Sequence, residues 1–222
     1  MHRLMHLFFV LFTFASLHAN DASNETTKET VKKENDPEDL VLTPNANWKD
    51  QEPSYYRAPK GATKGIKGLG YPYTPWYDHY AWHESEPLNE HAERSFRLGD
   101  EDSAFAIIVT DKHQVAWDDL DDIVIKNAKE SGFEHARIAS IEKRKVNGND
   151  VIFVHWKALL QGIHVDFLSY LYSGPKGSVF IHTYTPSNIF KDNKKAMELF
   201  LNGFTIEPAK TDADTGKDKT KS

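Results

Sequence analysis

The chain of 222 residues contains no cysteine. Disulfide bonds, thiol catalysis, cysteine zinc sites and a lipid-bearing cysteine are therefore excluded. The common enzyme signatures are also absent, because there is no G-x-S-x-G nucleophile elbow, no H-E-x-x-H metal motif and no P-loop. We therefore expect a protein that is not an enzyme. A hydrolase stays open as an alternative, since a serine and its histidine can lie far apart in a sequence.

The chain has no overall excess of positive charge. Its 33 acidic and 27 basic residues give a net charge of −6 at pH 7. A nucleic-acid-binding domain would show a basic face, and a peripheral membrane protein would show a polybasic stretch. The total charge indicates neither of these, so we expect no nucleic-acid partner.

Residues 1–19 have the three parts of a secretory signal peptide. Arg3 precedes an apolar run from Leu7 to Phe14, and small or polar residues follow as far as Ala19. Cleavage after Ala22 is a second option. A membrane anchor needs about 20 apolar residues, so a cleaved signal is favoured over a signal anchor. No later apolar run is long enough to cross a membrane. We therefore predict an exported protein, periplasmic or secreted, with no transmembrane segment in its mature part.

Composition divides the rest of the chain into an ordered centre with polar flanks. The flanks are nearly all polar or charged, and such segments cannot bury enough apolar surface to fold. We expect a disordered linker at 20–39 and an irregular arm at 40–70, packed at most locally on the domain. An α+β globular domain should follow at 71–208, and a disordered polar tail at 209–222.

Within the domain, strand spacing gives way to helical spacing. Residues 103–110 are apolar enough for a buried strand. Apolar residues then recur at helical intervals: Trp117, Leu120, Val124 and Ala128. Acidic residues crowd the first turns of this helix and Gly132 follows its last turn, as the helix dipole and a C-terminal cap favour. A second, shorter helix is indicated at 196–203.

Three hairpins are predicted between the two helices, which makes an antiparallel meander of four strands. Asn147-Gly148 is the preferred two-residue hairpin turn, and Gln161-Gly162 offers a second one. A turn at Gln161-Gly162 pairs Leu160 with Ile163 and decides which side chains share a face. The face expected under the helices carries Ile152, Val154, Trp156, Ala158, Val165, Phe167 and Leu171.

The opposite face of the meander is predicted to be polar and half exposed. It carries His155, Lys157, His164, Asp166, Leu168, Tyr170 and Tyr172. Asp166 lies opposite Lys157 in this register, which favours a cross-strand ion pair. The loop at 173–177 leaves the face of His182 undecided. Tyrosine offers apolar area with a polar tip and suits protein docking, so we predict a partner surface made of Trp82, His155, His164, Tyr170 and Tyr172.

Three stretches, in this order, resemble one known fold: AWDDLDDIVIKNAKESG, KVNGNDVIFVHWKALLQGIHVDFLSYLY and AMELFLNGFTI, spanning roughly 117–206. Their order is similar to that of the PsbP-like fold, shared by the PsbP subunit of photosystem II, a yeast Ran-binding release factor and bacterial exported proteins. The resemblance implies an α+β domain, an antiparallel sheet packed by two or more helices. It also implies an accessory or binding module with a protein partner. It carries no functional residue over to this chain.

The segment WYDHYAWHESEPLNEHAE, Trp76 to Glu93, is rich in histidine and glutamate. His79 and His83 are four residues apart, which brings them together on a helix but leaves them about 13 Å apart on a strand. The aromatic residues around them favour a strand. A turn at 87–89 would return His91 beside His83. A zinc or copper site at His83 and His91, with His79 nearby, is therefore the alternative to an ordinary exposed strand and turn without a cofactor.

Export of the full chain should release a mature protein that begins at Asn20, because signal peptidase cuts after small residues such as Ala19. Intact-mass spectrometry of the exported fraction measures the new N-terminus. A start at Ser23 would assign the cleavage to Ala22. A full-length chain found only in the membrane fraction would contradict cleavage and support a signal anchor.

Overall fold

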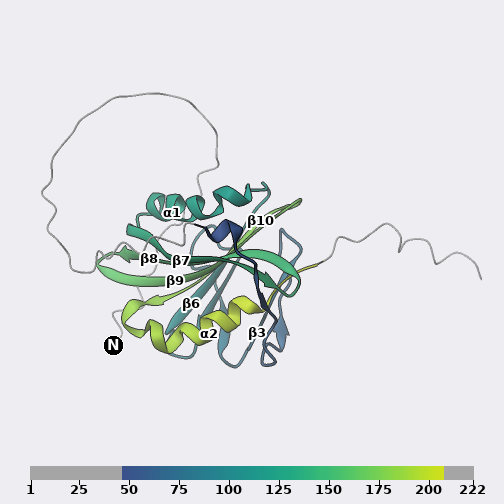
Figure 1. The fold of residues 1–222 in the computed structure, drawn as a ribbon. Coiled ribbons are helices and arrows are strands. Elements are labelled where there is room, and N and C mark those ends of the chain that lie inside the picture. Colours follow the sequence, from purple (N-terminus) through teal and green to yellow (C-terminus); the bar gives the residue numbers. More distant parts are fainter. Residues whose placement is uncertain (1–46, 208–222) are drawn as a thin grey trace, which may run out of the picture.

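The computed structural model describes residues 47–207. The predicted signal peptide, the linker at 20–39 and the tail at 209–222 lie outside the described residues. One eight-stranded sheet forms the centre, with helix α1 over one face and helix α2 over the other (Figure 1). This is the predicted α+β architecture, an antiparallel meander packed by helices. None of the helices in the described part is both long and apolar enough to cross a membrane.

The strand order in the large sheet is β1-β7-β8-β9-β10-β6-β5-β4. Its strands are β1 (Ser54–Tyr56), β4 (Trp82–Ser85), β5 (Arg94–Leu98), β6 (Ala104–Asp111), β7 (Glu134–Val146), β8 (Asn149–Leu160), β9 (Ile163–Gly174) and β10 (Gly177–Pro186). A three-stranded sheet combines β2 (Lys64–Gly65), β3 (Tyr73–Tyr77) and β11 (Phe204–Ile206). The helices are α1 (Leu120–Glu130) and α2 (Phe190–Asn202), with short 3-10 helices η1 (Trp48–Asp50), η2 (Trp117–Asp119) and η3 (Ser187–Ile189).

The four long strands β7 to β10 form the predicted meander. Asn147-Gly148 has φ angles of 49° and 87°, and Gln161-Gly162 has φ angles of 50° and 81°. Turns with two such residues match the right-handed twist of antiparallel strands. Leu160 consequently pairs with Ile163, as the sequence predicts.

The third hairpin is tighter than the predicted loop. β9 continues to Gly174 and β10 begins at Gly177, and these two glycines pair with each other. The register that results places His182 opposite Ser169. Because Trp156 donates a hydrogen bond to the Ser169 hydroxyl at 2.9 Å, His182 lies on the face of the sheet that carries Trp156.

The face of the meander that packs under α1 is the predicted core. α1 contributes Leu120, Val124 and Ala128, the residues whose helical spacing predicts this helix. The rings of Trp156 and Phe167 stack with centroids 3.7 Å apart. All residues predicted for this face are buried: Ile152, Val154, Trp156, Ala158, Val165, Phe167 and Leu171.

The opposite face of the meander is more buried than the predicted half-exposed surface: Asp166, Leu168 and Tyr170 are buried, whereas His164 is exposed and His155, Lys157 and Tyr172 are half buried. Leu168 and Tyr170 are 0% and 1% exposed. α2 and the three-stranded sheet cover them, because these elements carry an apolar stripe of their own that must be buried. The covering side chains are Tyr73, Met197, Phe200, Leu201 and Phe204. The sheet therefore has one core on each face.

The arm before Tyr71 is part of the folded domain. Trp48 is 5% exposed and belongs to the core under α1. β1 runs parallel to β7, and β2 pairs with β3. The arm predicted as irregular at 40–70 thus contributes two strands, and the folded part begins earlier than the predicted boundary at 71. The sequence did not reveal β1 because its partner strand, β7, lies about 90 residues further along the chain.

Replacing Trp48 by alanine should lower the free energy of unfolding by about 3 kcal/mol, because the arm loses its buried side chain. Urea unfolding followed by circular dichroism measures the change. Tyr55→Ala is the matched control, because the Tyr55 side chain, in the same arm, is 75% exposed. This substitution should lower the free energy of unfolding by less than about 0.5 kcal/mol. Equal effects of the two substitutions would contradict the placement of Trp48 in the core.

Candidate functional site

The histidine-rich segment folds as a strand, a turn, a second strand and a loop. β3 ends at Tyr77, the turn that follows holds His79, and β4 carries His83. Thr63 Oγ1 lies 3.1 Å from Nδ1 of His79. The segment is therefore extended on either side of a tight turn, and His79 and His83 do not share a helix face.

His91 does not return beside His83, so the predicted pairing is wrong. Across the sheet His83 faces Arg97 instead, because β5 begins only after the loop that holds His91. The two histidines have different acidic neighbours, Asp100 at 4.0 Å from His83 and Glu90 at 3.3 Å from His91. Between residues 47 and 207, no three histidine, aspartate or glutamate side chains gather as a metal site requires.

Glu93, at the end of the same segment, has a structural role that the sequence does not reveal. One carboxylate oxygen accepts hydrogen bonds from the Leu69 N–H and from the Tyr73 hydroxyl, the latter at 3.0 Å. The other oxygen accepts from the Thr110 hydroxyl at 2.7 Å. Burial and the nearby Glu93 charge raise the pKa of Tyr73 far above its usual value, so its hydroxyl stays a donor. The carboxylate ties the loop before β3 to β6.

Trp82 is not part of an exposed surface, contrary to the prediction. Its side chain is 3% exposed, and its ring centroid lies 4.8 Å from that of Phe200 in α2. α2 covers this tryptophan, which belongs to the core on the α2 side of the sheet. Tyr80, in the preceding turn, is the exposed aromatic residue of this segment, at 82%.

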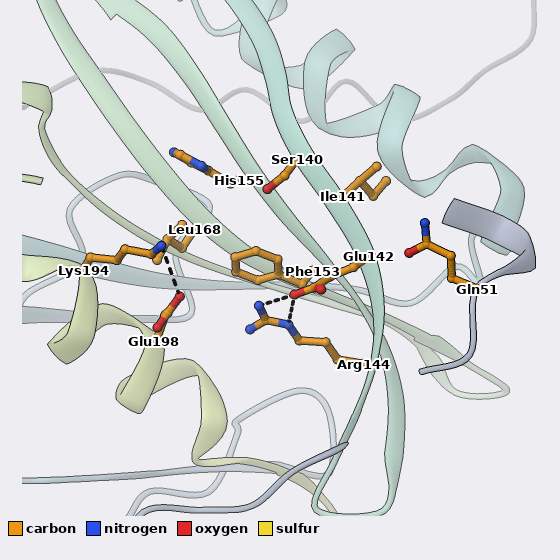
Figure 2. A pocket seen from close by; sticks show the side chains of 10 residues that line it. All are labelled: Gln51, Ser140, Ile141, Glu142, Arg144, Phe153, His155, Leu168, Lys194 and Glu198. Atoms are coloured by element: carbon orange, nitrogen blue, oxygen red, sulfur yellow. Dashed lines mark hydrogen bonds and ion pairs between the residues drawn. The ribbon is translucent and has the colours of Figure 1, made fainter. Parts of the chain in front are cut away.

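A pocket of about 250 Å³ opens on the α2 side of the sheet, between α2, β7 and β8 (Figure 2). Segments far apart in the sequence meet there, and most of the lining is polar. Its charges are balanced, because Lys194 lies 3.9 Å from Glu198 and Arg144 forms an ion pair with Glu142. The lining residues are Gln51, Ser140, Ile141, Glu142, Arg144, Phe153, His155, Leu168, Lys194 and Glu198.

Arg144 is a buried charge that is held in one position. It is 5% exposed, and its guanidinium lies 3.5 Å from the ring centroid of Phe153 and 4.4 Å from that of Tyr56. Glu142 accepts a hydrogen bond from Nε at 2.6 Å, and the Tyr170 hydroxyl accepts one from Nη1 at 3.1 Å. A buried cation is tolerated where aromatic faces and acceptors surround it in this way. The pocket therefore contains a preorganised positive charge.

Tyr170 supports Arg144 and does not face solvent. Its hydroxyl accepts from Arg144 and donates to Oδ1 of Asn202 at 2.5 Å. Burial raises the pKa of Tyr170 to about 12, although the charge of Arg144 opposes the rise. The prediction that Tyr170 belongs to a partner surface is therefore corrected, because α2 covers it.

His155 lines the pocket and is oriented by the buried Asp166. Its Nε2 lies 2.7 Å from Oδ1 of Asp166, and its ring stacks on Phe190 with centroids 5.0 Å apart. Lys157 lies 3.3 Å from the same carboxylate, as predicted for a cross-strand ion pair. Burial alone would raise the pKa of Asp166, but hydrogen bonds from His155 and Ser187 outweigh it and hold the pKa below its ordinary value. The charged carboxylate fixes the ring of His155.

The other residues of the predicted partner surface lie apart from the pocket. His164 is exposed beside the β8–β9 turn, opposite Leu159. Tyr172 is half buried, with its ring against those of Tyr71 and Phe204. The five residues predicted for this surface do not form one surface, and among them only His155 lines the pocket.

A serine and a histidine do meet in the core under α1. Ser169 Oγ lies 2.8 Å from Nδ1 of His182, and Trp156 donates to the same Oγ. Both residues are buried, at 0% and 4% exposure, out of reach of a substrate. Burial lowers the pKa of His182 to about 4, which keeps the ring neutral. The pair satisfies buried polar groups rather than forming a catalytic dyad.

The chain is similar in fold to solved structures of very different sequence. No protein-family profile and no curated protein sequence matches it. Cyanobacterial PsbP (CyanoP) from Synechocystis superposes with a TM-score of 0.50 at 13% identity, over 67% of this chain and 95% of that chain. At this identity the likeness shows the fold alone, and the chain has a PsbP-like fold, as its sequence resemblance predicts.

Two further structures match more weakly. LpqN of Mycobacterium tuberculosis, involved in cell envelope biogenesis, has a TM-score of 0.40 at 9% identity, over 73% of this chain and 95% of that one. A Pseudomonas aeruginosa protein of unknown function has a TM-score of 0.43 at 11% identity, over 58% of this chain and 83% of that one. Neither adds to the assignment of the fold.

Lowering the pH from 6.5 to about 4 should destabilise the protein by up to about 3 kcal/mol through His182. The unfolded chain takes up a proton near pH 6.5, whereas burial keeps the folded chain from doing so until about pH 4. The contribution of His182 to the free energy of unfolding is therefore fully present above this window and is lost as the pH falls through it.

Urea unfolding of the wild type and of His182→Gln, at several pH values, measures this contribution. The difference between their free energies of unfolding should shrink as the pH falls, because the variant lacks the titrating group. A difference that stays constant between pH 6.5 and 4 would contradict a buried neutral histidine.

Proposed function

We propose that this protein is an exported, non-catalytic binding module that holds a protein partner at the pocket beside α2. The observation that carries the proposal is the lining of the pocket, which presents paired and positioned charges. Arg144 is fixed by Glu142 and two aromatic rings, and His155 is fixed by Asp166. Rigid charged groups of this kind suit recognition of a partner, because little conformational freedom is lost on binding.

The size of the pocket favours a single side chain of a protein over a small-molecule substrate. Small-molecule sites usually measure about 300–1,000 Å³ and are lined mainly by apolar residues. This pocket measures about 250 Å³, and most of its lining is polar or charged. A partner's polar side chain fills such a volume and finds donors and acceptors within it.

The rim of the pocket offers charges that a partner can recruit. Lys194 and Glu198 are one turn apart on α2, and their side chains are 51% and 35% exposed. An exposed pair of this kind contributes only about 0.3–0.5 kcal/mol. Either charge can therefore re-pair with a group of the partner at little cost to the stability of the fold.

The geometry supports the two alternatives less well. A hydrolase needs a nucleophile beside a base in an open site, whereas Ser169 and His182 are buried in the core. A zinc or copper site at His83 and His91 needs these rings together, whereas they have different neighbours.

A photo-crosslinking residue placed at Ser140, which is exposed and lines the pocket, should trap a discrete protein adduct in cells that produce the protein. Mass spectrometry identifies the adduct. Lys194→Glu, on the facing helix, should weaken the adduct because it reverses a rim charge while leaving the fold intact. The adduct from Ser140 and its weakening by Lys194→Glu both report on the pocket and not on the core.

The matched control carries the same crosslinking residue at Lys129, which is exposed on α1 over the opposite face of the sheet. An adduct from Ser140 alone supports the proposed function. Absence of any adduct from Ser140, or the same adducts from both positions, would overturn it.

A further inference from the structure

Arg144 keeps hydrogen-bond donors that its neighbours in the fold do not use. A guanidinium group carries five N–H donors. Glu142 accepts from Nε at 2.6 Å and contacts Nη2 as well, and the Tyr170 hydroxyl accepts from Nη1. In the part of the chain that the structure describes, Arg144 has no other acceptor. One N–H on each Nη atom is therefore left for another molecule.

The pocket is the route to these donors. The Arg144 side chain is only 6% exposed, and the rings of Phe153 and Tyr56 pack against its guanidinium. Figure 2 shows the Nη end of Arg144 directed toward the side of the pocket from which Lys194 and Glu198 project. A group that enters the pocket therefore meets N–H donors from β7 and charged side chains from α2.

Glu198 supplies the acceptor on the α2 side. Its carboxylate lies 3.9 Å from Lys194, and both side chains are partly exposed. Lys194 is its only ion-pair or hydrogen-bond partner among residues 47–207. A carboxylate has about four lone-pair sites, so Glu198 can accept a hydrogen bond from a ligand without losing Lys194.

We propose that the pocket receives a primary carboxamide, the side chain of a glutamine or an asparagine of the partner. Its carbonyl oxygen accepts from the free N–H groups of Arg144, and its NH₂ group donates to Glu198. The acceptor and the donor of a carboxamide are separate atoms, so one group can satisfy both sides of the pocket. The inference rests on the proposed role in protein capture and names the group that the pocket recognises.

The charges of the lining disfavour other side chains. The cations Arg144 and Lys194 are balanced by Glu142 and Glu198. An ionised side chain of either sign therefore meets two like charges, and no net opposite charge offsets its desolvation. An apolar side chain would leave the donors of Arg144 without an acceptor. A neutral group with a donor and an acceptor avoids both costs.

The test is an NMR titration of the isotope-labelled mature chain, followed through the Nε–H resonance of Arg144. The probes are capped peptides, acetyl-Gly-X-Gly N-methylamide, in which X is glutamine, glutamate, lysine or serine. Only X = glutamine brings a primary carboxamide. We expect a saturable shift with this peptide and an affinity about tenfold higher than for each of the other three.

Glu198→Lys should reverse the preference. The substitution removes the acceptor and makes the lining positive, so the glutamine peptide should bind about tenfold more weakly and the glutamate peptide more tightly. Glu130→Lys on α1 is the matched control. Glu130 is 36% exposed and lies 4.0 Å from Lys126 one turn earlier, whereas Glu198 is 35% exposed and 3.9 Å from Lys194. The control should leave all four affinities unchanged, and circular dichroism verifies the fold of both variants.

Equal affinities for the four peptides, or no shift with any of them, would overturn the proposal. So would a preference for glutamine that survives Glu198→Lys, or one that Glu130→Lys abolishes as well. Crosslinking at Ser140 reports whether a protein partner binds, whereas the titration reports which group the pocket takes. An adduct without a preference for glutamine therefore contradicts this inference alone, and a preference for glutamine without an adduct contradicts only the capture of a protein.

Discussion

The central sheet must be covered on both of its faces, and the placement of every other element follows from that requirement. Trp156 and Phe167 project toward α1, whereas Phe153 and Leu168 project toward α2. One helix cannot shield both faces, so the chain supplies α1 for one and α2 with the three-stranded sheet for the other (Figure 1). Any polar group that enters either core must bring its partner with it.

Two buried polar residues, one on each face of the sheet, show how this condition is met. On the α2 side, Arg144 is enclosed by two aromatic rings, a glutamate and Tyr170. On the α1 side, His182 remains neutral beside Ser169. The pocket exists where the α2 cover is incomplete, and its charged lining is the outer end of the network around Arg144. The proposed binding at this site is thus linked to the packing of α2.

The parts of the fold that depend on local chemistry could be predicted from the sequence. Two turn dipeptides and the alternation of side chains are sufficient for the meander, its register and the core under α1. The second core could not be predicted, because Lys157 and Asp166 make the other face look polar. A tyrosine such as Tyr170 is equally suited to an exposed face and to a core with a hydrogen-bond partner. Only the position of α2 decides between the two.

The candidate site is harder to predict than the fold, because the type of a residue does not say which residues lie beside it in space. The three histidines of Tyr71 to Glu93 are close in sequence but have separate contacts. Gln51 and Lys194 are far apart in sequence but line the same pocket. Only His155 belongs both to the partner surface predicted from the sequence and to the lining of the pocket.

The early position of the arm in the chain has a consequence for the order of folding. Its partners are made much later, because Lys49 contacts Asp118 across 69 positions and Ala58 contacts Asn147 across 89. Contacts between such distant residues close large loops and form late. The part of the folded domain that is synthesised first is therefore among the last to dock. Until it does, the outer edge of β7 has no neighbouring strand, and a bare edge is where a nascent chain pairs with the wrong molecule.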